Sequence, residues 1–224
     1  MGRIVNGKDV KPHAMPWQII LVWKHTTTLH CGGSIICPNF IISAAHCSYQ
    51  KKEGTTIITR KFTGEDHDIL VGEHDLTRPS GTRHAIKTIH VHPEYEAKVV
   101  IGKPDKSKDY DVSIYELTHP IEMKPSSQAI HLPNPGDHKL PVGTMMATSG
   151  WGKLEDGGPT PAILQATKVP LVADQDCKRA YPRQYTDRQV CAGFLDTGHT
   201  DSCSGDSGGN NFKNNCPNEK LNEV

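Results

Sequence analysis

The chain has 224 residues, with 25 basic and 25 acidic side chains and a formal net charge of zero. This length suits one domain, or two small subdomains that share a core. The sequence contains neither the basic block of a nucleic-acid-binding protein nor an acidic solvating tail. Its longest apolar runs, such as residues 18–23, are far shorter than the ~20 residues that cross a bilayer.

Short apolar segments separated by Gly, Pro, Asn and Asp run along the chain, and this pattern predicts an all-β barrel or sandwich. Asp174–Ala180 is the one predicted helix, with Asp174 as its N-cap. The predicted strands, in chain order, are Gln18–Trp23, Ser34–Ile36, Phe40–Ser43, Ile57–Thr59, Ile69–Val71, His84–Val91, Val112–Leu117, Met145–Ser149, Leu164–Leu171 and Val190–Phe194.

Three segments are predicted to be connections. Gln50–Gly64 and Glu96–Lys108 are polar and lysine-rich, which is typical of solvated surface loops. Asn134–Gly143 contains two prolines and two glycines and is predicted to link two halves of the molecule.

The start of the chain and its cysteines bear on its compartment. Residues 1–7 lack the apolar stretch of a signal peptide, so a chain that began there would stay in the cytosol, whereas one that had lost a leader would be secreted. Seven cysteines are more typical of a secreted protein. Because the number is odd, at least one has no partner within the chain.

The segment Asp201–Gly209 carries the strongest chemical signal. It places Ser207 among glycines and aspartates. A serine hydroxyl is a weak nucleophile until a base removes its proton. Glycines on both sides let backbone N–H groups approach a substrate. The segment therefore predicts a nucleophile, an oxyanion site and a specificity acid together.

Two other segments supply partners for such a serine. Ser43–Cys47 ends a strand-like run and places His46 among small residues; histidine is the side chain best suited to proton transfer near neutral pH. Asp111 lies at the mouth of an apolar strand, where an aspartate would orient a histidine ring. Asp109, two places earlier, is the weaker candidate for that role.

Two other site chemistries fit less well. A zinc site would use four residues whose spacing matches no standard zinc motif. The run Gly205–Gly209 also fits the Gly-x-Ser-x-Gly motif of α/β-hydrolases, in which the histidine follows the serine. His199 is the last histidine in the chain and precedes Ser207, so the sequence excludes the α/β-hydrolase arrangement. The zinc candidates are Cys31, Cys37, His46 and Cys47.

The order His46, Asp111, Ser207, each with its neighbours, resembles the trypsin-like (chymotrypsin-fold) serine proteases. The resemblance implies two six-stranded antiparallel Greek-key barrels with the active site between them. The N-terminal barrel would span about residues 16–117, the linker 118–143 and the C-terminal barrel 144–209. Matching segments are Ile4–Gly7, Cys31–Ser34, Ser43–Cys47, Val91–Tyr95, Ser149–Gly152, Val190–Gly193 and Asp201–Gly209.

The resemblance also implies the roles of the triad and the oxyanion hole. Ser207 would be the nucleophile, His46 the general base and acid, and Asp111 the residue that orients the histidine. The N–H groups of Gly205 and Ser207 would form the oxyanion hole.

Specificity and activation follow from the same resemblance. Asp201, beside Ser202, would lie at the base of the specificity pocket and select Arg or Lys before the cut bond. Residues 1–3 would be the remnant of a propeptide. Cleavage between Arg3 and Ile4 would free an amino group that pairs with Asp206.

Disulfides and metal binding are the last implications of the resemblance. Glu73 matches the first acid of the family's calcium loop, but Arg83 stands at the second, so neither a metal nor another cofactor is expected. The resemblance pairs four cysteines and leaves three open. The pairs are Cys31–Cys47 and Cys177–Cys191, and the open residues are Cys37, Cys203 and Cys216.

Residues 210–224 depart from the family. They are asparagine-rich and are predicted to form a disordered tail that cannot rebuild a barrel strand pair. The second barrel would then be incomplete, with open edges and a gapped core. We expect a secreted, monomeric serine endopeptidase that cuts after Arg or Lys and meets protein substrates and protease inhibitors, but neither nucleic acid nor a membrane. The alternative is a truncated, inactive homologue that acts as a binding protein, or a non-functional gene-model fragment.

Overall fold

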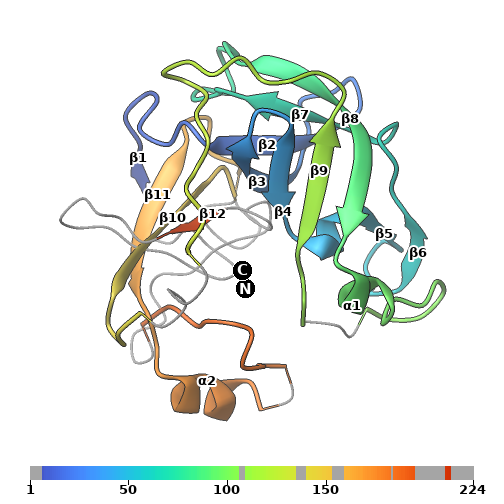
Figure 1. The fold of residues 1–224 in the computed structure, drawn as a ribbon, viewed down its shortest axis with the longest axis vertical. Helices are drawn as coiled ribbons and strands as arrows, with labels where there is room; N and C mark the ends of the chain where they lie inside the picture. Colours follow the sequence, from blue (N-terminus) through green and yellow to red (C-terminus); the bar gives the residue numbers. More distant parts are fainter. Residues whose placement is uncertain are drawn as a thin grey trace.

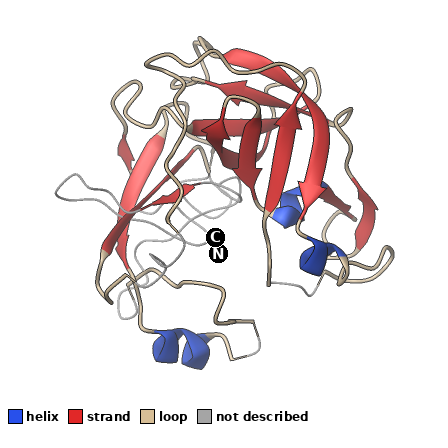
Figure 2. Cartoon of the chain, viewed as in Figure 1, coloured by secondary structure: helices blue, strands red, loops and turns tan. Residues whose placement is uncertain are grey.

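A computed structural model describes residues 7–105, 109–134, 140–152, 159–182, 184–194 and 210–212. The described chain is mainly β-structure, with a closed six-stranded barrel and a separate four-stranded sheet (Figures 1 and 2). This architecture confirms the predicted all-β class. None of the described helices is long and apolar enough to cross a membrane.

The barrel is built from antiparallel strands in the order β2-β3-β4-β9-β8-β7. Along β2, Ile19 and Leu21 face the interior of the barrel, whereas Ile20 and Val22 face outward into a second apolar cluster. Burial of both faces explains why this strand is a continuous apolar run rather than an alternating one. The strands are β2 (Gln18–Trp23), β3 (Leu29–Cys37), β4 (Phe40–Ser43), β7 (His67–Val71), β8 (Thr82–Val91) and β9 (Ser113–Leu117).

The second sheet has the order β1-β11-β10-β12. Its last strand corrects the prediction of disorder at residues 210–212, because β12 pairs with β10 in the register Ala147↔Phe212. Ladder hydrogen bonds join main-chain groups, so a polar segment can add a short strand without an apolar face. The strands are β1 (Lys8–Asp9), β10 (Met145–Gly150), β11 (Gln165–Pro170) and β12 (Asn210–Phe212).

An apolar cluster joins the outer face of the barrel to the second half of the chain. Ile20 and Leu70 come from the barrel, whereas Trp151 and Leu164 come from the other half. Trp151 is only 2% exposed, and its indole donates a hydrogen bond to the carbonyl of Ala162 at 3.2 Å. A Trp side chain buries a large apolar area, so the burial of Trp151 in this cluster stabilises the interface.

Segment 50–64 contains part of a hairpin, formed by β5 (Tyr49–Lys51) and β6 (Ile58–Lys61), and β6 confirms the strand predicted at Ile57–Thr59. The description of the whole segment as a surface loop was wrong, because Ile58 and Phe62 are buried in the barrel cluster, at 1% and 3% exposure. The other predicted loop, 96–108, follows the short helix α1 (Pro93–Glu96), and its residues 97–105 form no helix or strand.

Two expectations in the second half also need correction. The helix α2 has the predicted bounds, Asp174–Ala180, but its N-cap is Ala173 and Asp174 is the first helical residue. Residues 190–194 form no strand. Ala192 makes only an isolated bridge to Leu171, and the apolar side chains at both ends of the segment are exposed.

Candidate active site

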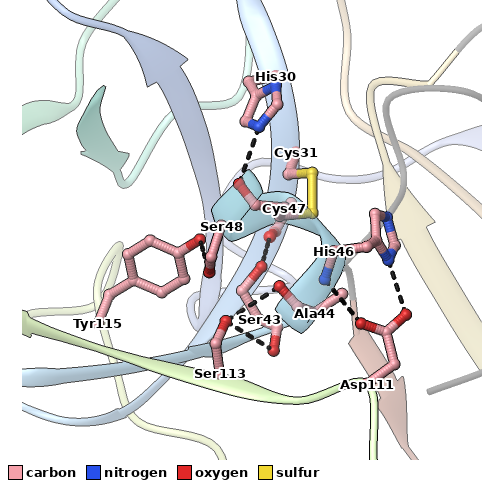
Figure 3. Close-up of a disulfide and its surroundings, with 11 residues drawn as sticks. His30, Cys31, Ser43, Ala44, His46, Cys47, Ser48, Asp111, Ser113 and Tyr115 are labelled. Atoms are coloured by element: carbon pink, nitrogen blue, oxygen red, sulfur yellow. Dashed lines mark hydrogen bonds and ion pairs between the residues drawn. A yellow bond between two sulfur atoms is a disulfide. The ribbon is translucent and has the colours of Figure 1, made fainter. Parts of the chain in front are cut away.

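His46 lies in η1 (Ala45–Ser48), a 3-10 turn that follows β4 directly. Ala44 and Ala45 are buried, and their small side chains let the turn pack closely against the end of the barrel. A disulfide between Cys47 and Cys31 joins the turn to β3, as the family resemblance implies (Figure 3). The backbone that carries His46 is therefore fixed on both sides.

Strand pairing brings Asp111 to the same edge of the barrel. β4 and β9 are antiparallel neighbours with Ser43 opposite Ser113, so the chain after β4 and the chain before β9 lie together. The buried Ser113 hydroxyl donates a hydrogen bond to the carbonyl of Ala44 at 2.9 Å. This register explains how residues 65 positions apart meet.

Asp111 contacts His46 through both carboxylate oxygens (Figure 3). Oδ1 accepts the backbone N–H of His46 at 2.8 Å, and Oδ2 lies 2.7 Å from the ring Nδ1. Because an ionised carboxylate only accepts hydrogen bonds, the ring hydrogen belongs on Nδ1. The Nε2 atom of neutral His46 is then an acceptor, as a general base requires.

The pair is accessible as well as ordered. The side chains of His46 and Asp111 are 30% and 19% exposed. A substrate can therefore reach the ring, while the carboxylate stays in contact with it.

Behind the disulfide lies an aromatic cluster that the sequence analysis missed. His67 is fully buried and stacks on His30 with ring centroids 4.5 Å apart, and Trp23 and Phe62 complete the cluster. Burial, followed by the nearby His30, lowers the pKa of His67 to about 4. His30 in turn contacts the carbonyl of Cys47 through Nε2 at 3.0 Å.

Asp109, the weaker candidate for orienting His46, is engaged elsewhere. Arg188 Nε and Nη2 donate to its two carboxylate oxygens at 2.9 and 2.7 Å. The contacts of Asp109 and Asp111 therefore distinguish two acids that the sequence places only two residues apart. Sequence reasoning had assigned no role to Arg188.

The zinc alternative rests on atoms that are close together but chemically unsuitable. Ligand atoms of Cys31, His46 and Cys47 lie within 4.8 Å of one another. Both sulfurs belong to one disulfide, whereas zinc binds thiolates. The remaining zinc candidate, Cys37, is a free cysteine among the described residues. These residues do not fit a zinc site.

The residues of the calcium-loop comparison have other partners. Glu73 Oε2 accepts the backbone N–H of Ser80 at 3.1 Å. Arg83 donates to Asp68 Oδ2 at 2.9 Å and to the carbonyl of Thr26 at 2.6 Å. Arg83 is therefore held as a cation in an ion pair. That the chain needs no cofactor stays a prediction.

The other implied disulfide, Cys177–Cys191, is also present in the structure. The remaining site residues predicted from the sequence lie outside the described part of the chain. They are Arg3, Ile4, Asp201, Ser202, Cys203, Gly205, Asp206, Ser207 and Cys216.

Comparison with known proteins places the chain in a family. The family model described as Trypsin matches residues 4–216, beyond Gly209 and through β12. A solved structure of neuropsin, described as a serine protease expressed in the limbic system of mouse brain, superposes with a TM-score of 0.74 at 25% identity. The alignment covers 93% of this chain and 82% of neuropsin.

Relatives of known sequence cover the chain almost as fully. Trypsin of Squalus acanthias is 33% identical over 92% of this chain and 78% of its own length, and trypsin of Simulium vittatum is 32% identical over 93% and 77%. Ovochymase-2 of Mus musculus is 31% identical over 92% of this chain, which spans only 32% of that protein. Because the family model and these relatives extend over nearly all of the sequence, the chain belongs to the trypsin family of serine endopeptidases.

Proposed function

We propose that this chain hydrolyses peptide bonds after Arg or Lys through an acyl-enzyme, once the bond between Arg3 and Ile4 has been cut. The observation that carries the proposal is the contact between His46 and Asp111, in which one carboxylate holds both the backbone and the ring of the histidine. That arrangement leaves Nε2 ready to accept a proton.

In the proposed reaction Ser207 attacks the scissile carbonyl carbon while His46 Nε2 takes the hydroxyl proton. The C–N bond then breaks, and the same Nε2 gives its proton to the leaving amine, which leaves an ester on Ser207. Water, deprotonated by His46 Nε2, attacks that ester. The C–O bond to Ser207 then breaks, Nε2 returns the proton to Ser207 Oγ, and the acid is released. Asp111 stabilises the imidazolium in both halves of the reaction.

Three residues of the segment 201–209 are proposed to bind the substrate. The N–H groups of Gly205 and Ser207 would donate to the oxyanion, where loss of one donor typically costs about 100- to 1000-fold in kcat. Asp201, beside Ser202, would pair with the cation of an Arg or Lys side chain. Their places in the family's sequence pattern support these roles.

We propose that the chain is activated as the family's zymogens are, by cleavage before Ile4. The new amino group of Ile4 would pair with Asp206 and order the neighbouring oxyanion site. Breaking such a buried pair costs about 3–5 kcal/mol. The two disulfides of the described chain support synthesis in an oxidising compartment, so we also propose secretion. We propose a monomer that encounters protein substrates and protein protease inhibitors.

The experiment is to cut before Ile4 and then treat the chain with a fluorophosphonate probe. We expect label on the wild-type chain, none on Ser207→Ala, and little on the uncut chain. Hydrolysis of arginyl and lysyl amides should exceed that of a phenylalanyl amide, and Asp201→Ser should remove the preference. A folded, cut chain without label would instead favour the inactive homologue that acts as a binding protein.

A further inference from the structure

A cluster of charged side chains joins the two halves of the molecule just before Asp111. Oδ1 of Asp109 accepts hydrogen bonds from Arg188 Nε at 2.9 Å and from Thr186 Oγ1 at 3.0 Å. Its Oδ2 accepts from Arg188 Nη2 at 2.7 Å and from Lys98 Nζ at 3.3 Å. Two parallel bonds from one guanidinium fix the orientation of a carboxylate as well as its distance.

The intervening residue, Tyr110, is held by the same cluster. Its ring stacks on His92 with centroids 4.7 Å apart. The guanidinium of Arg188 and the ammonium of Lys98 lie 4.6 and 4.9 Å from the centroid of the Tyr110 ring. Its φ of 57° lies in the left-handed region, which a tyrosine keeps only where its surroundings impose it. The carbonyl of Tyr110 accepts the N–H of Val112 at 2.7 Å. The backbone is therefore restrained on both sides of Asp111.

The restraint comes from the second half of the chain. Thr186 and Arg188 belong to a turn after α2, in which the Thr186 N–H donates to Gln189 Oε1 at 2.8 Å and the Gln189 N–H to the Thr186 carbonyl at 3.2 Å. The turn is thus ordered by its own bonds. The hydrogen bonds from Arg188 hold the pKa of Asp109 well below its usual range, against the opposing effect of burial, so the contact persists as an ion pair at neutral pH.

We propose that Arg188 is a positioning residue for hydrolysis, because it fixes the turn that holds Asp111 against His46. The inference rests on the proposed function, since it takes that pair as catalytic. Arg188 belongs to the same half of the sequence as Ser207. The contact therefore ties the orienting acid to the half of the chain that carries the nucleophile.

Steady-state kinetics of the cut enzyme test the proposal. Misplacement of a catalytic group by about 1 Å can cost ~100-fold in rate, so we expect Arg188→Ala to lower kcat about 10- to 100-fold. KM should stay within about twofold, because the contact acts on the reacting groups rather than on substrate binding. Arg188→Lys should give an intermediate kcat, since an ammonium cannot make two parallel bonds. Asp109→Asn should lower kcat by about the same factor as Arg188→Ala. The double variant should show no further loss of kcat.

Arg179→Ala is the matched control. Arg179 pairs with Asp176 on the surface of α2, at 3.1 Å and 78% exposure, and we expect its removal to leave kcat unchanged. An equal loss in this variant would overturn the proposal. So would a kcat for Arg188→Ala within twofold of wild type, or a rise in KM alone, which would make Arg188 a substrate contact.

A second readout does not depend on activity. The hydrogen on His46 Nδ1 should give a downfield proton NMR resonance, because it lies in a short bond to a carboxylate. We expect Arg188→Ala to shift or broaden this resonance, and Arg179→Ala to leave it in place. An inactive wild-type chain would contradict the proposed function, but the resonance would still decide whether Arg188 positions Asp111. An unchanged resonance in Arg188→Ala overturns the inference.

Discussion

Asp111 holds His46 by two different hydrogen bonds, one to the backbone and one to the ring. The backbone N–H fixes which carboxylate oxygen faces the main chain, so only Oδ2 remains for Nδ1. The pair therefore sets both the position of the histidine and its tautomer.

Asp111→Asn should change that tautomer. The amide oxygen of Asn must stay with the His46 N–H, so its NH2 group faces Nδ1 and forces the ring hydrogen onto Nε2. We expect kcat to fall about 10⁴-fold, as is typical for this change in a serine-protease triad, with little change in fold. Hydrolysis of an arginyl amide by the cut enzyme measures the loss. Asp176→Asn, on α2, is the control and should retain full activity.

Ser113→Ala tests the link between the two strands that position His46 and Asp111. Its buried hydroxyl bonds the carbonyl of Ala44, and loss of such a bond costs about 1 kcal/mol in the free energy of unfolding. Ser127 makes a matched bond to the carbonyl of Glu122 at 2.7 Å, away from the site. Both alanine variants should lose similar stability in urea, but only Ser113→Ala should lower kcat. Equal activity in the two variants would contradict this link.

The apolar segments of the sequence predicted the positions of the barrel strands well. β2 and β4 have the predicted bounds, Gln18–Trp23 and Phe40–Ser43, because each is a short, largely buried run of mostly apolar residues. The pairing of His46 with Asp111 followed from the family resemblance, and strand register supplies its physical reason.

Most of the features that the sequence analysis missed lack a local sequence signal. β1 is a polar dipeptide whose strand character comes only from pairing with β11, and β12 likewise forms through its backbone. Arg188 contacts Asp109 although the two residues are 79 positions apart in the sequence, and no local pattern around Arg188 predicts this partner. Only His67 had a weak signal, because it lies two and four places before the buried Ile69 and Val71 in the same strand.

Removal of the Cys31–Cys47 disulfide should affect both stability and activity. Its residues are 16 positions apart, and closing a loop of that length stabilises a protein by roughly 3 kcal/mol. The control is the double alanine variant at Cys177 and Cys191, which are 14 positions apart. Urea unfolding should show similar losses for both pairs. kcat should fall more for Cys31→Ala/Cys47→Ala, because Cys47 adjoins His46.

His67 should make the fold sensitive to mild acid. Its pKa is about 4 in the folded chain, lowered by burial and then by His30, against an ordinary value of 6.5. Between these values the unfolded chain binds the proton more tightly, so stability is full above pH 6.5 and declines as pH falls toward 4. The loss over this window should be about 1–3 kcal/mol.

Urea unfolding of the full chain between pH 7 and pH 4 measures this loss. His67→Phe keeps an aromatic ring in the cluster but removes the proton site, so its stability should decline less steeply than that of wild type over the same window. A smaller slope should remain, because burial also lowers the pKa of the neighbouring His30. His131→Gln, at an exposed position, serves as the control and should match wild type. Equal slopes for wild type and His67→Phe would show that the folded chain accommodates the charged ring without cost.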